Sequence, residues 1–259
     1  MSSEVVALAS KTFSDVTAAI SEFVGTAQIS RPPDNFFDAG LIGSLADAYE
    51  AAERDGARAI VLCSEGKNFC AGADFSNQRV SGGARELYEQ AFRLFEAPLP
   101  VVAAVQGKAV GGGLGLACSA DFRVITQQTV FTANFSRLGL HHGFGLTVTL
   151  PAIVGQQRAW QMLYSGRSCL ADDAMSCGLA EYKHPHPRHV AHAMAGWIAE
   201  AGPLAVRSIR ATMRGDLAAR VKAATDHELA EQEKLWQTAD FAEGVRATAE
   251  RRAPNFAGH

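Results

Sequence analysis

Two short, wholly apolar runs constrain the fold of this chain most strongly. Residues 59–63 read AIVLC and residues 100–105 read PVVAAV. Such runs are typical of strands that are buried on both faces of a parallel sheet. Each leads through a glycine-rich segment to a helical pattern, first over residues 84–96 and then from Gly112, and residues 122–125 predict another buried strand. Strands that alternate with helices imply right-handed crossovers, so the sequence predicts an α/β fold with parallel strands.

The two ends of the chain extend this pattern. Residues 12–20 and 26–30 are expected to form paired strands joined by a short polar turn, and residues 37–54 are expected to form an amphipathic helix. From Leu146 onward the pattern is almost wholly helical. One helix in this region is predicted from an apolar stripe that contains Val190, Met194, Trp197 and Ile198. Because no linker or repeat interrupts the sequence, we expect one α/β core with a helical C-terminal third.

Composition excludes several classes of protein. The 259 residues carry 24 Lys and Arg against 27 Asp and Glu, a net charge of −3, so no basic field is available to hold nucleic acid. The five cysteines are odd in number and include no CxxC pair, which indicates a reduced intracellular protein. No run approaches the roughly 18 apolar residues of a membrane span. The sequence therefore predicts a cytoplasmic protein with no membrane or nucleic-acid partner.

The glycine run at 111–115 does not have the spacing of a nucleotide-binding motif. Leu116 stands where a dinucleotide fingerprint needs glycine, and Ala109 stands where a phosphate loop needs Ser or Thr. No G-x-S-x-G sequence for a nucleophilic serine occurs. What remains is a strand that feeds a glycine turn opening a helix, whose free N–H groups can stabilise a developing oxyanion. A tight packing turn is the alternative interpretation.

A second glycine-rich segment, residues 64–74 (SEGKNFCAGAD), follows the first buried strand and could offer an N–H group to the same oxygen. These two segments, in this order and at this separation, resemble those of the crotonase (enoyl-CoA hydratase/isomerase) superfamily. Further matching stretches are PLPVVAAVQG at 98–107, LG at 138–139, SGR at 165–167 and GLA at 178–180. The resemblance implies a spiral of ββα units over residues 1–200. It also implies a C-terminal helical region, 201–259, that packs in a homotrimer or a dimer of trimers.

The resemblance also implies a ligand and a set of binding residues. The ligand would be an acyl-CoA thioester, with coenzyme A entering as part of the substrate and no separate cofactor. The thioester carbonyl would lie between the backbone N–H groups of Ala73 and Gly112. Ala71 and Arg31 would contact the coenzyme A portion, Arg31 from a turn that resembles the family's adenine-binding edge. Arg251 would supply a cation to the phosphates of a neighbouring subunit's ligand, although adjacent arginines are also typical of a solvated face.

The sequence departs from the family pattern at the chemical step. Hydratases of this family use two glutamates to activate water, and Gly115 and Phe135 stand at those positions here. His141 and His142, in the loop that borders the reactive carbons in the family, could act as acid and base instead. Hydrogen bonds from these rings to the loop backbone are the alternative. If the histidines take no part, Glu65 and Asp74 are the next carboxylates that could act as acid or base.

The second histidine group, HPHPRHVAH at 184–192, is interpreted as a solvent-exposed loop and helix start rather than a metal site. The leading functional hypothesis is an enoyl-CoA hydratase/isomerase-type enzyme that stabilises a thioester enolate with acid and base residues other than the usual glutamates. A hydrolase of acyl-CoA or C–C bonds that uses a loop histidine is the second hypothesis. A non-catalytic acyl-CoA-binding protein is the third.

Overall fold

A computed structural model describes residues 10–73 and 80–259 of the chain. The strands are β1 (Lys11–Phe13), β2 (Val16–Ser21), β3 (Val24–Ile29), β4 (Ala59–Ser64), β5 (Val101–Val105), β6 (Lys108–Val110), β7 (Phe122–Ile125), β8 (Val130–Thr132), β9 (Ser168–Leu170) and β10 (Tyr182–Lys183). The helices are α1 (Ala39–Arg54), α2 (Val80–Glu96), α3 (Gly112–Ser119), the 3-10 helix η1 (Asn134–Leu138), α4 (Leu146–Val154), α5 (Gln156–Ser165), α6 (Ala171–Ser176), α7 (Pro187–Glu200), α8 (Pro203–Arg214), α9 (Leu217–Leu235) and α10 (Ala239–Ala249).

The strands form two sheets that the chain visits in turn. The larger has the order β1-β2-β3-β4-β5-β7-β10, antiparallel from β1 to β3 and parallel from β3 onward. The smaller has the order β6-β8-β9. The chain passes from β5 to β6 and then to α3, and from β7 to β8 and then to η1. The chain thus forms the spiral of ββα units that its family resemblance implies.

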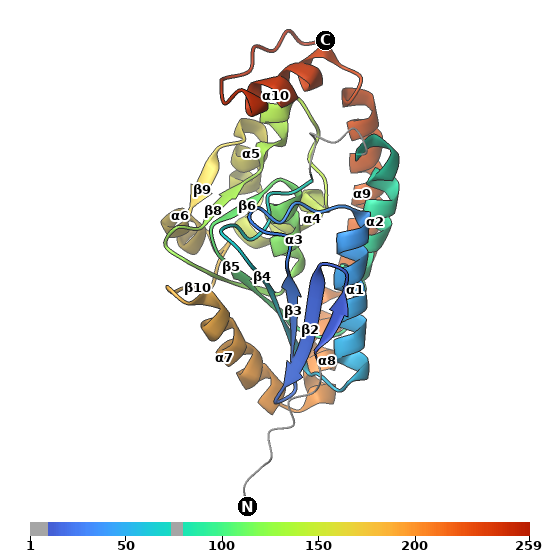
Figure 1. Ribbon diagram of the computed structural model, residues 1–259, viewed down its shortest axis with the longest axis vertical. Helices are drawn as coiled ribbons and strands as arrows, with labels where there is room; N and C mark the ends of the chain where they lie inside the picture. Colours follow the sequence, from blue (N-terminus) through green and yellow to red (C-terminus); the bar gives the residue numbers. More distant parts are fainter. Residues whose placement is uncertain (1–9, 74–79) are drawn as a thin grey trace, which may run out of the picture.

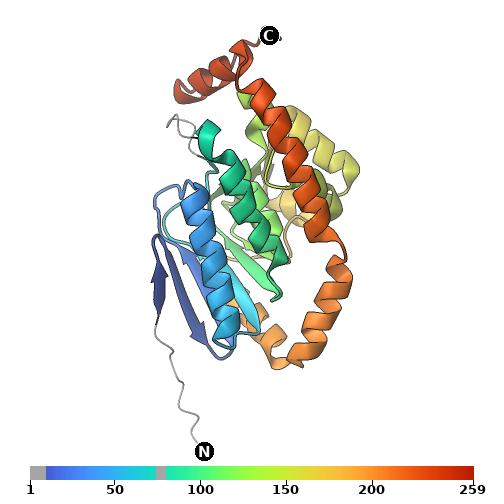
Figure 2. The same cartoon turned by 90° about the vertical axis from the view of Figure 1, so that its right-hand side faces the viewer.

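Helices cover both faces of the larger sheet. Figure 2 shows α1 and α2 side by side over one face, with α9 next to α2, and α7 covers the other face (Figure 1). This arrangement explains the apolar run of residues 59–63, since all six residues of β4 are buried. The main core extends into the C-terminal helices, because Val221 of α9 belongs to it. None of the described helices has the length and apolar character to cross a membrane.

Three expectations about local structure need correction. The strand expected over residues 12–20 is broken by a turn in which Ser14 has φ of 50°, so β1 and β2 are separate antiparallel strands. Trp197, expected on the buried stripe of α7, is 61% exposed, because small alanines make the closest contact with the sheet from this helix. The region after Leu146 also contains the short strands β9 and β10. The expected division at residue 200 falls between α7 and α8.

Candidate active site

A cavity of about 430 Å³ lies beside the segments that follow β4 and β6. The loop after β4 and the first residues of α3 form one wall, and side chains of α2, α9 and α10 form the opposite part. The lining residues central to the site are Phe37, Ala71, Gly72, Ala73, Tyr88, Gly112, Phe135, Gly143, Phe144, Gln232 and Trp236. Val245, Thr248 and Ala249 of α10 complete the lining at its outer end.

The two glycine-rich segments meet at this cavity because glycines let their backbones touch. Gly72 has φ of 88°, and a Cβ on it would lie 2.7 Å from the Val110 carbonyl oxygen and 3.4 Å from the Gly112 nitrogen. A Cβ on Gly113 would lie 2.1 Å from the Cys70 carbonyl oxygen. Only residues without a side chain permit contacts this close. Ala73 and Gly112, 39 positions apart in the chain, therefore line the same cavity.

The backbone amides of Ala73 and Gly112 belong to residues that line the cavity. Gly112 is the first residue of α3, and the N-cap Gly111 donates its own N–H to the Thr132 carbonyl at 2.8 Å. Within the described ranges, neither the Ala73 nor the Gly112 N–H donates to a protein acceptor. The first amides of a helix also carry partial positive charge. Two such donors on one cavity wall can stabilise negative charge on an oxygen.

Aromatic side chains surround residues 115 and 135, the two positions at which the family resemblance predicts glutamates. A Cβ on Gly115 would lie 2.6 Å from the Cβ of Phe144, so Phe144 fills the space a larger residue 115 would need. Phe144 is 1% exposed, and its ring centroid lies 5.4 Å from that of Phe37. Phe135 is also buried. This part of the cavity is therefore packed with apolar side chains.

Tyr88 and Gln232 supply polar atoms to this otherwise apolar region. The Tyr88 hydroxyl donates to Gln232 Oε1 at 2.9 Å, and Gln232 Nε2 donates to the His141 carbonyl at 3.0 Å. Burial raises the pKa of the Tyr88 hydroxyl, so it stays protonated at neutral pH. The sequence analysis missed both residues. Tyr88 lies on the predicted helix 84–96, where nothing in the spacing separates it from a core residue.

The two loop histidines lie behind the cavity wall. Their rings stack with centroids 4.2 Å apart, and His142 Nε2 lies 2.8 Å from Thr147 Oγ1. Of this loop, the described cavity lining includes Gly143 and Phe144 but neither imidazole. Burial, with smaller contributions from His141 and His227, lowers the pKa of His142 to about 4, so this ring is neutral at pH 7. The catalytic role of the histidines stays a prediction.

Glu228 of α9 holds this loop from the other side. Its carboxylate is fully buried and accepts hydrogen bonds from the Gly145 N–H at 2.9 Å and the Thr147 N–H at 3.0 Å. Thr147 Oγ1 donates a third hydrogen bond at 2.6 Å, and His142 Nε2 lies 3.8 Å away. Glu228 thus caps the N-terminus of α4, where N–H groups lack partners within the helix. The loop is fixed by a residue 83 positions away from Gly145.

Of the residues expected to contact coenzyme A, Ala71 lines the cavity and Arg31 lies near its edge. The Arg31 guanidinium forms ion pairs with Asp15 at 2.7 Å and Asp38 at 3.0 Å. Against the cost of burial, these carboxylates raise the pKa of Arg31, which is therefore a fixed cation. Arg31 also donates to the carbonyl of Phe36, which lines the cavity.

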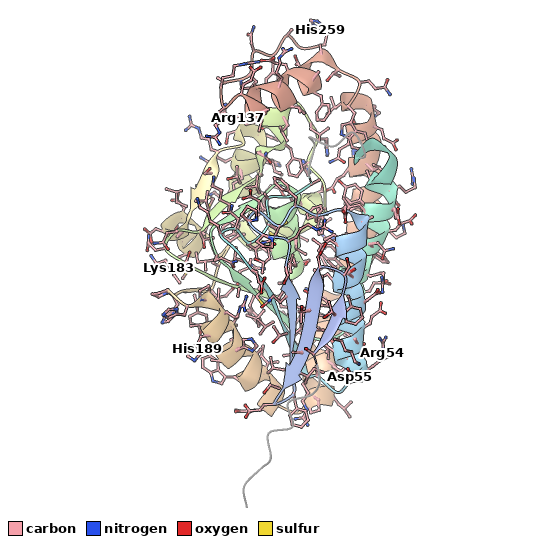
Figure 3. All side chains as sticks on the ribbon, viewed as in Figure 1. Arg54, Asp55, Arg137, Lys183, His189 and His259 are labelled. Carbon is pink, nitrogen blue, oxygen red and sulfur yellow. The ribbon has the colours of Figure 1, made fainter. Side chains whose placement is uncertain are left out.

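The other expected residues lie elsewhere. Arg251 follows α10, is exposed, and is not among the described residues that line the cavity. Glu65 is exposed and accepts a hydrogen bond from Gln28 Nε2 at 2.8 Å. Asp74 lies outside the described residues. His189 is exposed on α7, as predicted (Figure 3), whereas His192 is partly buried beside Thr26. The described residues contain no group of His, Cys, Asp and Glu that could hold a metal ion.

Comparison with known proteins gives a consistent result. Residues 19–259 match the family model described as enoyl-CoA hydratase/isomerase. A Rhodobacter capsulatus protein named probable enoyl-CoA hydratase is 34% identical over 248 residues, which cover 92% of this chain and 96% of that protein. An enoyl-CoA hydratase/isomerase structure from Pseudoalteromonas atlantica T6c has a TM-score of 0.86 at 28% identity, covering 94% of this chain and 100% of its own. A structure named putative enoyl-CoA hydratase from Streptomyces coelicolor A3(2) has a TM-score of 0.73 at 29% identity and covers both chains completely.

Proposed function

Because this chain belongs to the enoyl-CoA hydratase/isomerase family, we propose that it is an enzyme that binds an acyl-CoA thioester and stabilises the thioester enolate. The enolate oxygen would accept hydrogen bonds from the Ala73 and Gly112 N–H groups. The observation that carries this proposal is the meeting of these two amides at one cavity, with neither engaged by a protein acceptor in the described ranges. Donors fixed in a water-poor site lower the energy of a charged intermediate because they need no reorganisation during the reaction.

The coenzyme A portion would extend from the thioester toward the cavity edge. Ala71 and Arg31 are the proposed contacts there, because Ala71 lines the cavity and Arg31 is held as a cation beside Phe36. Arg251 is proposed to reach the phosphates of a neighbouring subunit's ligand, which fits its exposed position after α10. We propose that the active protein is a cytoplasmic homotrimer or dimer of trimers.

The reaction itself proceeds without the usual pair of glutamates. Gly115 and Phe135 cannot transfer protons, and Phe144 occupies the space of a side chain at residue 115. Formation of an enolate releases an α-proton, so an isomerisation and a hydration alike need a base in place of the glutamates, and His141 or His142 is the proposed acceptor. A hydrolase that uses His141 or His142 to activate water is the second candidate. A binding protein without turnover is the third.

The oxyanion proposal is tested by removing one N–H group. Ala73→Pro deletes this donor, whereas Ala73→Ser keeps the N–H and serves as the matched control. On a panel of enoyl-, oxo- and aryl-CoA thioesters, we expect Ala73→Pro to lower kcat by about 100-fold to 1,000-fold, as loss of one oxyanion donor does in other enzymes. The kcat of Ala73→Ser should stay close to that of the unchanged protein.

The same panel separates the three candidate functions. Release of free coenzyme A, followed with a thiol reagent, identifies a hydrolase, and tight binding without turnover identifies a binding protein. Equal kcat in the proline and serine variants, with both correctly folded, would contradict the proposed role of the Ala73 amide.

A further inference from the structure

We propose that Tyr88 and Gln232 form a binding site for a hydroxyl group on the acyl portion of the substrate. The enzyme would then select hydroxylated acyl-CoA thioesters over unsubstituted ones of the same skeleton. This inference rests on the proposed function, because it places the acyl group in the cavity described above. It assigns a specificity role to two residues that the oxyanion proposal does not use.

The Tyr88 hydroxyl is located where the loop lacks a side chain. A Cβ on Gly143 would lie 2.0 Å from Tyr88 Oη and 2.8 Å from Gln232 Nε2. Both polar atoms therefore share the space over Gly143. All three residues line the cavity. Because residue 143 has no side chain, the Tyr88 hydroxyl can lie against the loop at this side of the cavity.

The site lies close to, but apart from, the proposed oxyanion hole. Gly143 is followed by Phe144, whose ring packs against that of Phe37. Phe37 in turn is so close to Gly112 that a Cβ there would lie 2.4 Å from Phe37 Cζ. Aromatic side chains thus separate the Tyr88 hydroxyl from the Gly112 amide. A hydroxyl bound at Tyr88 would be several bonds from the thioester carbon.

Hydrogen-bonding capacity selects a hydroxyl as the partner. Tyr88 donates its proton to Gln232 Oε1 at 2.9 Å. A phenolic oxygen also accepts hydrogen bonds, and none of the described N–H or O–H groups donates one to Tyr88 Oη, so its acceptor position is open. Gln232 Nε2 uses one proton on the His141 carbonyl and has a second to give. One acceptor and one donor side by side match a hydroxyl, which both donates and accepts.

The surroundings make this pairing selective. Phe135, Phe144 and Leu138 are buried apolar residues that line the same cavity. A substrate hydroxyl that leaves water for such a site needs a protein partner to offset its lost hydration. One satisfied hydrogen bond of this kind is worth about tenfold to a hundredfold in affinity. An unsubstituted acyl group forms no hydrogen bond with Tyr88 or Gln232.

The Tyr88–Gln232 hydrogen bond also joins α2 to α9, so the experiment must separate binding from structural support. The test measures dissociation constants by calorimetry for two matched pairs: 4-hydroxyphenylacetyl-CoA with phenylacetyl-CoA, and 6-hydroxyhexanoyl-CoA with hexanoyl-CoA. The first pair represents an aromatic source of the hydroxyl and the second an aliphatic one. The proteins are the unchanged chain, Tyr88→Phe, Gln232→Met and the control Tyr164→Phe, which removes a hydroxyl from a 73% exposed tyrosine on α5.

We expect the unchanged protein and Tyr164→Phe to prefer the hydroxylated member of at least one pair by about tenfold or more. Tyr88→Phe and Gln232→Met should lose this preference and keep their affinity for the unsubstituted member. A purely structural role would weaken both members equally and would overturn the inference, as would equal affinities in the unchanged protein. If none of the four thioesters binds, the proposed function itself fails, which is a distinguishable result.

Discussion

Phe144 determines much of the chemical character of the cavity, and it does so from a strained backbone position. Its φ is 62°, in the left-handed region that a bulky residue rarely adopts, at a cost of roughly 1–2 kcal/mol. Burial of the ring against Phe37 and the Glu228 carboxylate that caps the following helix offset this cost. In this position the side chain fills the space beside Gly115 and makes that end of the cavity apolar.

Gly115 and Phe144 should therefore be energetically coupled. Gly115→Ala places a Cβ 2.6 Å from that of Phe144, which is closer than van der Waals contact, so we expect the substitution to lower the free energy of unfolding by about 1–3 kcal/mol. In a Phe144→Gly background, which removes the Cβ as well as the ring, the space is open, and the same substitution should stabilise helix α3 by up to roughly 1 kcal/mol. Urea denaturation of the four proteins in this cycle measures the coupling. An equal cost of Gly115→Ala in both backgrounds would show that the two residues do not compete for space.

The candidate site could be predicted from the sequence only where backbone geometry defines it. Gly72 and Gly112 mark turns whose tight approach requires glycine, so the position of the Ala73 and Gly112 amides follows from the pattern around them. Tyr88 and Gln232 could not be found in this way. Their pairing joins residues 144 positions apart, and it depends on the packing of α9 against α2. Neither residue type nor spacing encodes that contact.

At the level of elements, α10 closes the outer end of the cavity and is seated on η1 through glycines. A Cβ on Gly244 of α10 would lie 2.5 Å from the carbonyl carbon and oxygen of Leu138. A Cβ on Gly139 would lie 2.9 Å from the Asp240 carbonyl group. Backbone therefore meets backbone along this contact. Val245, Thr248 and Ala249 of the same helix line the cavity, so its outer wall depends on this seating.

Gly244→Ala should displace α10, because the new methyl group meets main-chain atoms that cannot rotate away. We expect a loss of about 1–3 kcal/mol in the free energy of unfolding and a weaker affinity for acyl-CoA. Gly196→Ala on α7 is the matched control, since nothing lies within 4 Å of a Cβ there. That control should gain about 0.5–1 kcal/mol through helix propensity. Thermal unfolding measures the stability of the two alanine variants, and calorimetric titration measures their affinity for acyl-CoA. Equal stability and equal affinity in both variants would contradict the prediction.

The elements themselves were predictable where a long pattern specifies them. The sequence of β4 is a continuous apolar run, which indicates a buried strand. The apolar residues of α1 recur with the period of 3.6 that indicates a helix. Both patterns extend over enough residues to be told apart. Strands β9 and β10 contain three and two residues, too few to show any period. They exist because β8 and β7 offer free edges to which these segments pair. Tertiary contacts, rather than local sequence, determine such short strands.

At the scale of the whole molecule, α8 leaves three large apolar side chains exposed. Leu204, Ile209 and Met213 are 83%, 63% and 81% exposed, and none of the residues of α8 is buried. Exposed apolar side chains that gather on one helix are typical of a protein–protein interface. Because α8 lies within the region 201–259 that is proposed to pack in a trimer, we assign its apolar side chains to contact with a second copy of this chain.

Leu204→Glu combined with Met213→Glu should therefore break the assembly. The unchanged protein is expected to have the mass of three or six chains by light scattering after size-exclusion chromatography, and the double variant that of one. Buried carboxylates in an apolar interface cost several kcal/mol, more than an assembly at micromolar concentration tolerates. Arg85→Glu on α2 changes the net charge by the same amount at an exposed residue and should leave the mass unchanged. An assembly that persists in the double variant would place the subunit contact on another surface, and a monomeric unchanged protein would refute the proposed trimer.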